Sequence, residues 1–213
     1  MQPTMLFILC ALLSAALATP LKRANTITAA NIITIDAKTS TCANAPVEGQ
    51  CRTAAQAAPY ISISYTNFGI TDFNTQAALL ALMLYESGAF KYSTNIYPGV
   101  AGQGTRNMQS PVDNLAYATW LSTVCSDCGV TSSQLEEANA AGPAAVLELV
   151  NTDEWGFGSA AWFLKTQCSE NVQQGLAAGT QSGWEEYLTG CLGTTVDDER
   201  NALWTAAMAL KQW

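Results

Sequence analysis

The stretch from Ala77 to Leu84 contains only apolar residues. Thr71 is a favourable N-cap residue ahead of it, and Asp72 would place a negative charge in the first turn, where it suits the helix dipole. Gly88 follows the stretch and is placed to end a helix. The pattern therefore predicts a helix from Thr71 to Glu86 that is buried on all sides and lies at the centre of the domain.

Helical spacing of apolar residues also predicts a helix before this one, from about Arg52 to Asn67. After Gln109 the chain returns to helices, and Asp197-Asp198-Glu199 resembles the acidic first turn of the last one. The predicted segments are Val112–Val124, Ser132–Ala140, Pro143–Val150, Gly158–Thr166, Glu170–Ala178, Ser182–Leu188 and Asp197–Lys211. Residues 24–41 are rich in Thr and Ile and are predicted to form either a loose arm or one strand.

Residues 88–111 follow a different pattern. Four glycines and two prolines interrupt a polar, aromatic segment with little helical periodicity. Such a segment favours a short β-hairpin or an irregular lobe. The expected fold class is therefore mainly α (α+β), with a small β lobe inserted after a buried central helix.

The N-terminus has the pattern of a secretory signal, in which an apolar run is followed by Ala16-Leu17-Ala18. Lys22-Arg23 is typical of a dibasic processing site. We therefore expect a signal peptide at 1–18, a short propeptide at 19–23, an N-terminal arm at 24–50 and one domain at 51–213. Localisation is expected to be secreted and extracellular.

Cysteine usage agrees with secretion. Six cysteines remain after the signal, and an even number in a secreted chain predicts disulfides. Proximity favours three pairs: Cys42–Cys51, Cys125–Cys128 and Cys168–Cys191. The alternative for Cys125-Ser126-Asp127-Cys128 is a metal or redox site.

The chain has no histidine, which excludes a Ser-His-Asp triad, a Cys-His pair and His-ligated zinc. Proton transfer would fall to carboxylates, tyrosines or lysines. Loss of Lys22 and Arg23 would take the net charge from −8 to −10. Such a charge repels nucleic acid and anionic membranes, so we expect neither as a partner. No cofactor and no metal site are predicted, and we expect a monomer.

Glu86 is the leading candidate for chemistry. It ends the predicted buried helix, where the helix dipole disfavours a carboxylate, and Tyr85, Phe90 and Tyr92 can shield it from water. Both effects raise a carboxyl pKa. A carboxylic acid that stays protonated can give its proton to the leaving oxygen of a glycosidic bond. The alternative is an ordinary surface glutamate at a helix end.

The sequence Glu86-Ser87-Gly88-Ala89-Phe90, with Gly104-Thr105-Arg106-Asn107-Met108-Gln109, resembles the Glu-Ser-x-x-Phe … Gly-x-Met-Gln pattern of goose-type lysozymes and soluble lytic transglycosylases. The resemblance implies a lysozyme-like fold with Glu86 as general acid and Gln109 as a cleft-lining residue. The Arg106-Asn107 pair and the Tyr97-Pro98-Gly99 loop depart from that pattern.

From about Cys51 to Leu210 the chain is also similar to a group of secreted fungal proteins with a lysozyme-like domain. The shared segments are Tyr-Glu-Ser-Gly, Pro-Gly-x-x-Gly-Gln-Gly-Thr-Arg-Asn-Met-Gln and Phe-Gly-Ser-Ala-Ala-Trp-Phe-Leu-x-Thr-Gln-Cys. This resemblance implies the fold more directly than the reaction.

A second carboxylate is sought among Asp113, Asp153 and Glu154, each of which could instead be a helix-start charge. A transglycosylase needs none, because the N-acetyl group of the substrate can act. The other expected substrate-binding residues are aromatic side chains for stacking on sugar rings and polar side chains for their hydroxyl and acetamido groups. They are Ser87, Tyr92, Asn95, Tyr97, Arg106, Asn107, Gln109, Trp155 and Phe157. Core packing is the alternative for the aromatic residues, and a loop-holding salt bridge is the alternative for Arg106.

The sequence thus favours a secreted enzyme that cleaves an N-acetylglucosamine-containing cell-wall polymer, namely peptidoglycan, chitin or chitosan. The first alternative is a non-catalytic carbohydrate-binding or effector protein on the same scaffold, since fold does not decide function. A structural wall protein is a third possibility. The polysaccharide is the expected partner.

Overall fold

The computed structural model describes residues 26–124 and 128–213, which form a mainly helical molecule. In these two ranges ten α-helices follow one another, with a 3-10 turn at Ala37–Ser40 and a π-helical turn at Tyr187–Cys191. They are α1 (Ala29–Ile35), α2 (Ala54–Asn67), α3 (Phe73–Glu86), α4 (Pro111–Val124), α5 (Ser132–Ala141), α6 (Pro143–Val150), α7 (Asp153–Gln167), α8 (Glu170–Ala177), α9 (Gln181–Glu186) and α10 (Asp198–Met208).

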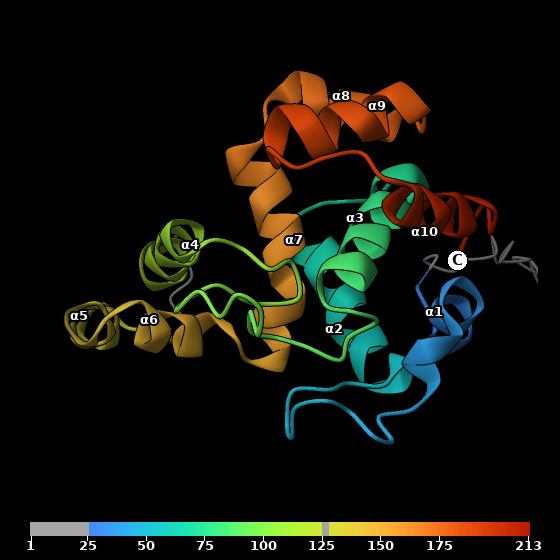
Figure 1. Cartoon of the computed structure of the whole chain (residues 1–213). Helices are drawn as coiled ribbons and strands as arrows, with labels where there is room; N and C mark the ends of the chain where they lie inside the picture. The colour runs from blue at the N-terminus through green and yellow to red at the C-terminus, as the bar shows by residue number, and fades with distance from the viewer. Residues whose placement is uncertain (1–25, 125–127) are drawn as a thin grey trace, which may run out of the picture.

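Helix α3 is the buried central helix that the apolar pattern predicts. All of its residues from Thr75 to Leu84 are buried. It packs against α7, α8 and α10, and Figure 1 shows these helices around it. The N-cap differs from the prediction. Asp72 takes that position in place of Thr71, because its carboxylate accepts the backbone N–H of Thr75 at 2.7 Å.

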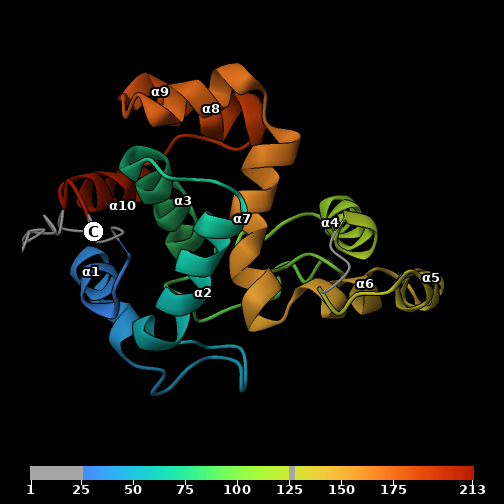
Figure 2. The ribbon, with the colours of Figure 1, turned by 180° about the vertical axis from the view of Figure 1, so that it is seen from behind.

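Helices α4, α5 and α6 form a small lobe to one side of α3, and α7 lies between this lobe and the rest of the molecule in both views (Figures 1 and 2). Helix α7 starts at Asp153, five residues before the predicted start at Gly158, because Thr152 caps it by accepting the Trp155 N–H. Gly158 suits the interior of this helix, since a Cβ there would lie 2.9 Å from the Tyr117 hydroxyl on α4.

The N-terminal segment is helical, so the prediction of a loose arm or strand at 24–41 is wrong for the part that is described. Thr28 and Asn31 form a capping box that starts α1. Ile27, Ile32 and Ile35 are buried in the same core as α3. The capping box and the burial of three isoleucines therefore favour a helix here, although Thr and Ile have a high propensity for β-strands. The predicted signal peptide and propeptide lie outside the described residues.

The expected β lobe is reduced to two isolated antiparallel bridges, Thr94–Gly104 and Gly104–Gln109, within the described part of the loop from 87 to 110. The side chain of Arg106 bonds the main-chain carbonyls that a neighbouring strand would bond in a β-sheet. The guanidinium of Arg106 donates to the carbonyls of Phe90, Tyr92 and Gln50 at 3.1, 2.8 and 2.6 Å. Carbonyls that are satisfied in this way need no ladder, so the loop stays irregular.

Two of the predicted disulfides are confirmed, Cys42–Cys51 and Cys168–Cys191. The third prediction involves Cys125, which lies outside the described residues. Within the described ranges, none of the helices is both long and apolar enough to cross a membrane.

Candidate functional site

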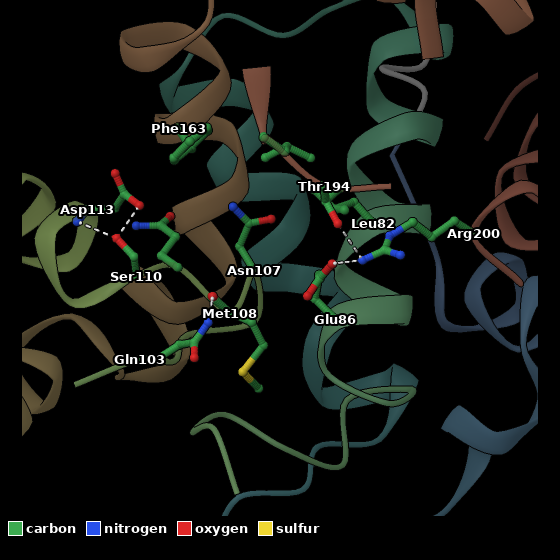
Figure 3. A pocket seen from close by; sticks show the side chains of 12 residues that line it. Leu82, Glu86, Gln103, Asn107, Met108, Ser110, Asp113, Phe163, Thr194 and Arg200 are labelled. Atoms are coloured by element: carbon green, nitrogen blue, oxygen red, sulfur yellow. Dashed lines mark hydrogen bonds and ion pairs between the residues drawn. The ribbon is translucent and has the colours of Figure 1, made fainter. Parts of the chain in front are cut away.

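A polar pocket of about 250 Å³ opens beside the C-terminal end of α3. The loop before α4 forms one wall, and the segment that leads into α10 forms the opposite wall (Figure 3). Its lining residues are Leu82, Glu86, Gln103, Asn107, Met108, Gln109, Ser110, Asp113, Phe163, Leu192, Thr194 and Arg200. Four candidates from the sequence, Glu86, Asn107, Gln109 and Asp113, therefore meet at one site.

Glu86 is the last residue of α3, and its side chain is 21% exposed. Burial raises the pKa of its carboxyl group, and the negative charge of Asp197 adds to this. Arg200 acts against both, because its Nη2 lies 3.1 Å from Glu86 Oε1. Burial is the largest effect, so the pKa remains above its ordinary value and the protonated form persists to higher pH.

Arg200, on the first turn of α10, pairs with Glu86 and so connects the last helix of the chain to the end of α3. Its guanidinium also pairs with Asp197, donates to the Thr194 hydroxyl at 3.1 Å and lies 3.9 Å above the Tyr85 ring. Sequence reasoning missed this residue. The available signal was a single arginine after three consecutive acids, but nothing local connects that arginine with Glu86.

Asp113 lines the pocket from the first turn of α4, and Figure 3 shows it on the opposite side from Glu86 with Asn107 between them. Its Oδ2 accepts from Ser110 Oγ at 2.6 Å. The other two acids lie elsewhere. Asp153 is paired with Arg52 at 2.7 Å, and Glu154 lines a separate hollow. Among the three candidates, only Asp113 can be the second carboxylate of this pocket.

Two amide side chains in the wall are buried and incompletely bonded. Asn107 is 7% exposed and Gln109 is 4% exposed, and neither Asn107 Oδ1 nor Gln109 Oε1 has a hydrogen-bond partner among the described residues. Gln103, in contrast, has a partner for both its oxygen and its nitrogen, since it accepts from Asn95 Nδ2 and donates to the Met108 carbonyl. Buried acceptors without partners are uncommon in folded proteins and indicate a place where a ligand or water binds.

The remaining predicted substrate-binding residues are not in the pocket wall. Ser87 is buried and bonded to Met83 and Phe90, while Asn95 holds the backbone of Gly99 and Val100. Phe157 is buried under the Arg106 guanidinium. The position of Phe157 agrees with the alternative of core packing, whereas Ser87 and Asn95 stabilise the local backbone.

Arg106 has neither of the two roles that the sequence suggested for it. Its side chain is 3% exposed, and its guanidinium donates hydrogen bonds to the three main-chain carbonyls named above. Arg106 therefore holds the loop through main-chain contacts, in place of the expected salt bridge or sugar contact. Burial lowers its pKa to about 10. Tyr92 packs near Gly88, Tyr97 is 92% exposed on the loop, and Trp155 lines the separate hollow with Glu154.

Across residues 26–124 and 128–213, no group of three or more carboxylate or cysteine side chains gathers closely enough to hold a metal ion. The polar side chains of the pocket comprise two carboxylates, three amides, two hydroxyls and one guanidinium. Such a set can hold a proton, donate it and bind sugar hydroxyl or amino groups.

No protein-family model matches the sequence, and no solved structure is significantly similar to it. The chain is similar to a curated protein of Fusarium oxysporum (strain Fo5176), a bifunctional dioxygenase (DOX)-epoxy alcohol synthase (EAS), with 41% identity over 140 residues. These residues are 65% of this chain but 11% of that protein. The similarity thus relates this chain to one short segment of a much longer relative.

Proposed function

We propose that the protein cleaves glycosidic bonds in an N-acetylglucosamine-containing cell-wall polymer, with Glu86 as the general acid. The observation that carries the proposal is a carboxyl group of raised pKa that lines a polar pocket with Asp113 across from it. The protonated carboxyl gives its proton to the leaving oxygen of the scissile bond. Asp113, or the substrate's own acetamido group, stabilises the opposite side of the sugar ring.

The arrangement also supports a lysozyme-like domain, as the motif resemblance implies. A buried helix ends in the glutamate, and the Gly104–Gln109 segment supplies amides to the same pocket. Disulfides are typical of oxidising compartments, which supports action outside the cell.

The net charge of −8 bears on the substrate. Bacterial walls carry anionic polymers, which repel an acidic protein at neutral pH. Neutral chitin, cationic chitosan and work in an acidic medium avoid this repulsion.

The second candidate is a sugar-binding protein without catalysis. One observation favours it, namely the ion pair between Glu86 and Arg200. A carboxylate that remains paired with a guanidinium has no proton to donate. The pH at which Glu86 takes up its proton therefore separates the two functions.

The test is incubation of the purified protein with peptidoglycan, chitin and chitosan from about pH 3 to about pH 7, with products read by mass spectrometry. Reducing ends indicate hydrolysis, and anhydro ends indicate transglycosylation. We expect Glu86→Gln to lower the rate by at least about 100-fold, as loss of a general acid does.

Glu154→Gln is the matched control, because it makes the same chemical change on an exposed side chain outside the pocket. It should retain full activity. If Glu86→Gln retains the activity of the unchanged protein, Glu86 is not the acid. If none of the three polymers is cleaved at any pH, the sugar-binding function replaces the enzymatic one.

A further inference from the structure

The unpaired acceptors of the pocket indicate which sugar it prefers. Asn107 Oδ1 and Gln109 Oε1 are buried, belong to side chains that line the pocket, and lack hydrogen-bond partners in the part of the chain that the structure describes. A buried carbonyl oxygen without a partner lowers stability, and a bound donor removes that penalty. The pocket therefore calls for a ligand rich in N–H or O–H groups.

The orientation of the Gln109 amide follows from its neighbour. Asn114, buried on α4, donates through Nδ2 to the carbonyls of Gly102 and Gln109. Its Oδ1 must then accept, and Gln109 Nε2 donates to it at 3.4 Å. Because the nitrogen of Gln109 is directed to Asn114, its oxygen is the atom left for a ligand.

The donors of the pocket are mostly occupied. Gln103 Nε2 donates to Met108, and Gln109 Nε2 donates to Asn114. Both terminal nitrogens of Arg200 are engaged with Asp197, Glu86 and Thr194. Within the described residues, Asn107 Nδ2 makes none of these bonds, and the buried Nε of Arg200 also has no partner.

The acceptors, in contrast, remain available on both sides of the pocket. Asp113 uses Oδ2 for Ser110, which leaves Oδ1, and Arg200 binds Oε1 of Glu86, which leaves Oε2. Asn107 lies between these two acids in Figure 3. An acetamido group offers one donor and needs one, whereas an ammonium group offers three donors and needs none.

We propose that this pocket binds the free amino group of a glucosamine unit, so that the preferred polymer is a deacetylated, chitosan-like chain. The inference rests on the proposed function for its polymer class and narrows that class to the cationic member. The positive charge of the amine also complements Asp113 and the net negative charge of the chain.

Binding tests the inference separately from cleavage. Glu86→Gln is titrated calorimetrically with short oligomers of glucosamine and of N-acetylglucosamine at about pH 5, where a free amine is charged. We expect the deacetylated oligomer to bind at least about tenfold more tightly. The preference should persist in about 0.5 M salt, since contacts in a buried site are screened less than surface charges.

Three further substitutions, each made in the Glu86→Gln background, locate the preference. Gln109→Met and Asp113→Asn should each reduce it by about fivefold or more, because each removes an acceptor for a charged donor. Asn107→Asp should increase it, an outcome that misfolding cannot imitate. Gln174→Met, on an exposed side chain in a different hollow, is the matched control and should change nothing.

Equal binding of the two oligomers, or tighter binding of the acetylated one, overturns the inference even if the protein cleaves chitin. The inference is also overturned if the preference for the amine disappears in salt or is unchanged by the pocket substitutions, because the preference then reflects net charge alone. A preference for the amine without any cleavage supports the inference and removes the catalytic function.

Discussion

At the scale of single residues, the proton of Glu86 is controlled by opposing effects. Burial and Asp197 favour the neutral carboxyl group, whereas Arg200 favours the carboxylate. The outcome is a raised pKa, which means that ionisation of this group costs folding free energy. This cost is absent below the ordinary pKa of 4.5 and is complete above the raised pKa of the folded protein.

Glu86→Gln should therefore gain stability relative to the unchanged protein as the pH rises. Glutamine has the same shape and never ionises, so the variant avoids the cost that appears above about pH 4.5. The difference in melting temperature, variant minus unchanged protein, should become more positive between about pH 4 and about pH 7. Thermal unfolding followed by circular dichroism measures it. A difference that is constant over this range would show that Glu86 titrates normally.

The residues of the pocket differ in how far the sequence predicted them. Glu86, Asn107, Gln109 and Asp113 lie within one short stretch, so a motif can place them together. Arg200 is 114 positions from Glu86, and its contact depends on how α10 packs. The sequence also left Arg106 open between a sugar contact and a salt bridge, because only the folded loop shows the carbonyls that it binds.

At the scale of elements, α10 joins the pocket through its cap. Asp197 is the N-cap residue, and its carboxylate both accepts the Arg200 N–H at 2.8 Å and pairs with the Arg200 guanidinium. Burial raises the pKa of Asp197, but the bonds from the Arg200 backbone N–H and guanidinium outweigh it and leave that pKa below its ordinary value. One side chain thus starts the helix and competes with Glu86 for the same arginine.

Asp197→Asn should lower the pKa of Glu86. Asparagine keeps the cap but removes the negative charge, so the repulsion that raises the Glu86 pKa is lost and Arg200 is free for Glu86. Titration of the Glu86 carboxyl carbon by NMR measures the shift, and the basic limb of any activity profile should move to lower pH. Asp198→Asn, one position further on and exposed, should leave the Glu86 titration unchanged. An upward shift in Asp197→Asn would contradict this interpretation of the network.

Replacing glycine by alanine should have opposite effects on stability at two helix positions, Gly183 and Gly156. A Cβ on Gly183 of α9 would lie 2.1 Å from the backbone oxygen of Gly175 on α8, so Gly183→Ala must separate the two helices and should cost about 3 kcal/mol. A Cβ on Gly156 of α7 would meet nothing closer than 3.7 Å. Gly156→Ala should therefore be neutral or stabilise by up to about 1 kcal/mol, because alanine favours helix. Urea unfolding of both variants measures the contrast, and similar effects would show that the α8–α9 contact is looser than described.

At the scale of the whole molecule, the two described disulfides restrain opposite ends of the fold. Cys42–Cys51 closes the segment between α1 and α2, and Cys168–Cys191 joins the end of α7 to the π-helical turn before the pocket wall. Leu192 and Thr194 of that wall follow Cys191 directly. The second disulfide therefore supports the pocket as well as the core.

Removing either disulfide by paired Cys→Ser substitutions should lower the free energy of unfolding by about 2–4 kcal/mol. The larger loss is expected for Cys168–Cys191, because its 23-residue separation exceeds the 9 residues of Cys42–Cys51 and a longer loop costs more entropy to close. Denaturant titration measures both losses. Loss of Cys168–Cys191 should also weaken oligosaccharide binding, while loss of Cys42–Cys51 should not, and the reverse order would contradict this account of the pocket wall.

The sequence by itself determined the local features of this protein. Apolar spacing and caps located most of the helices, the unbroken Ala77–Leu84 stretch identified the buried one, and short separations identified two disulfides, because these signals act between neighbours along the chain. Only the tertiary structure decided that the 26–50 segment joins the core, that Arg106 replaces a β ladder, and that Arg200 reaches Glu86. Those contacts join residues far apart in sequence, so they depend on how the helices pack and leave no periodic pattern to read.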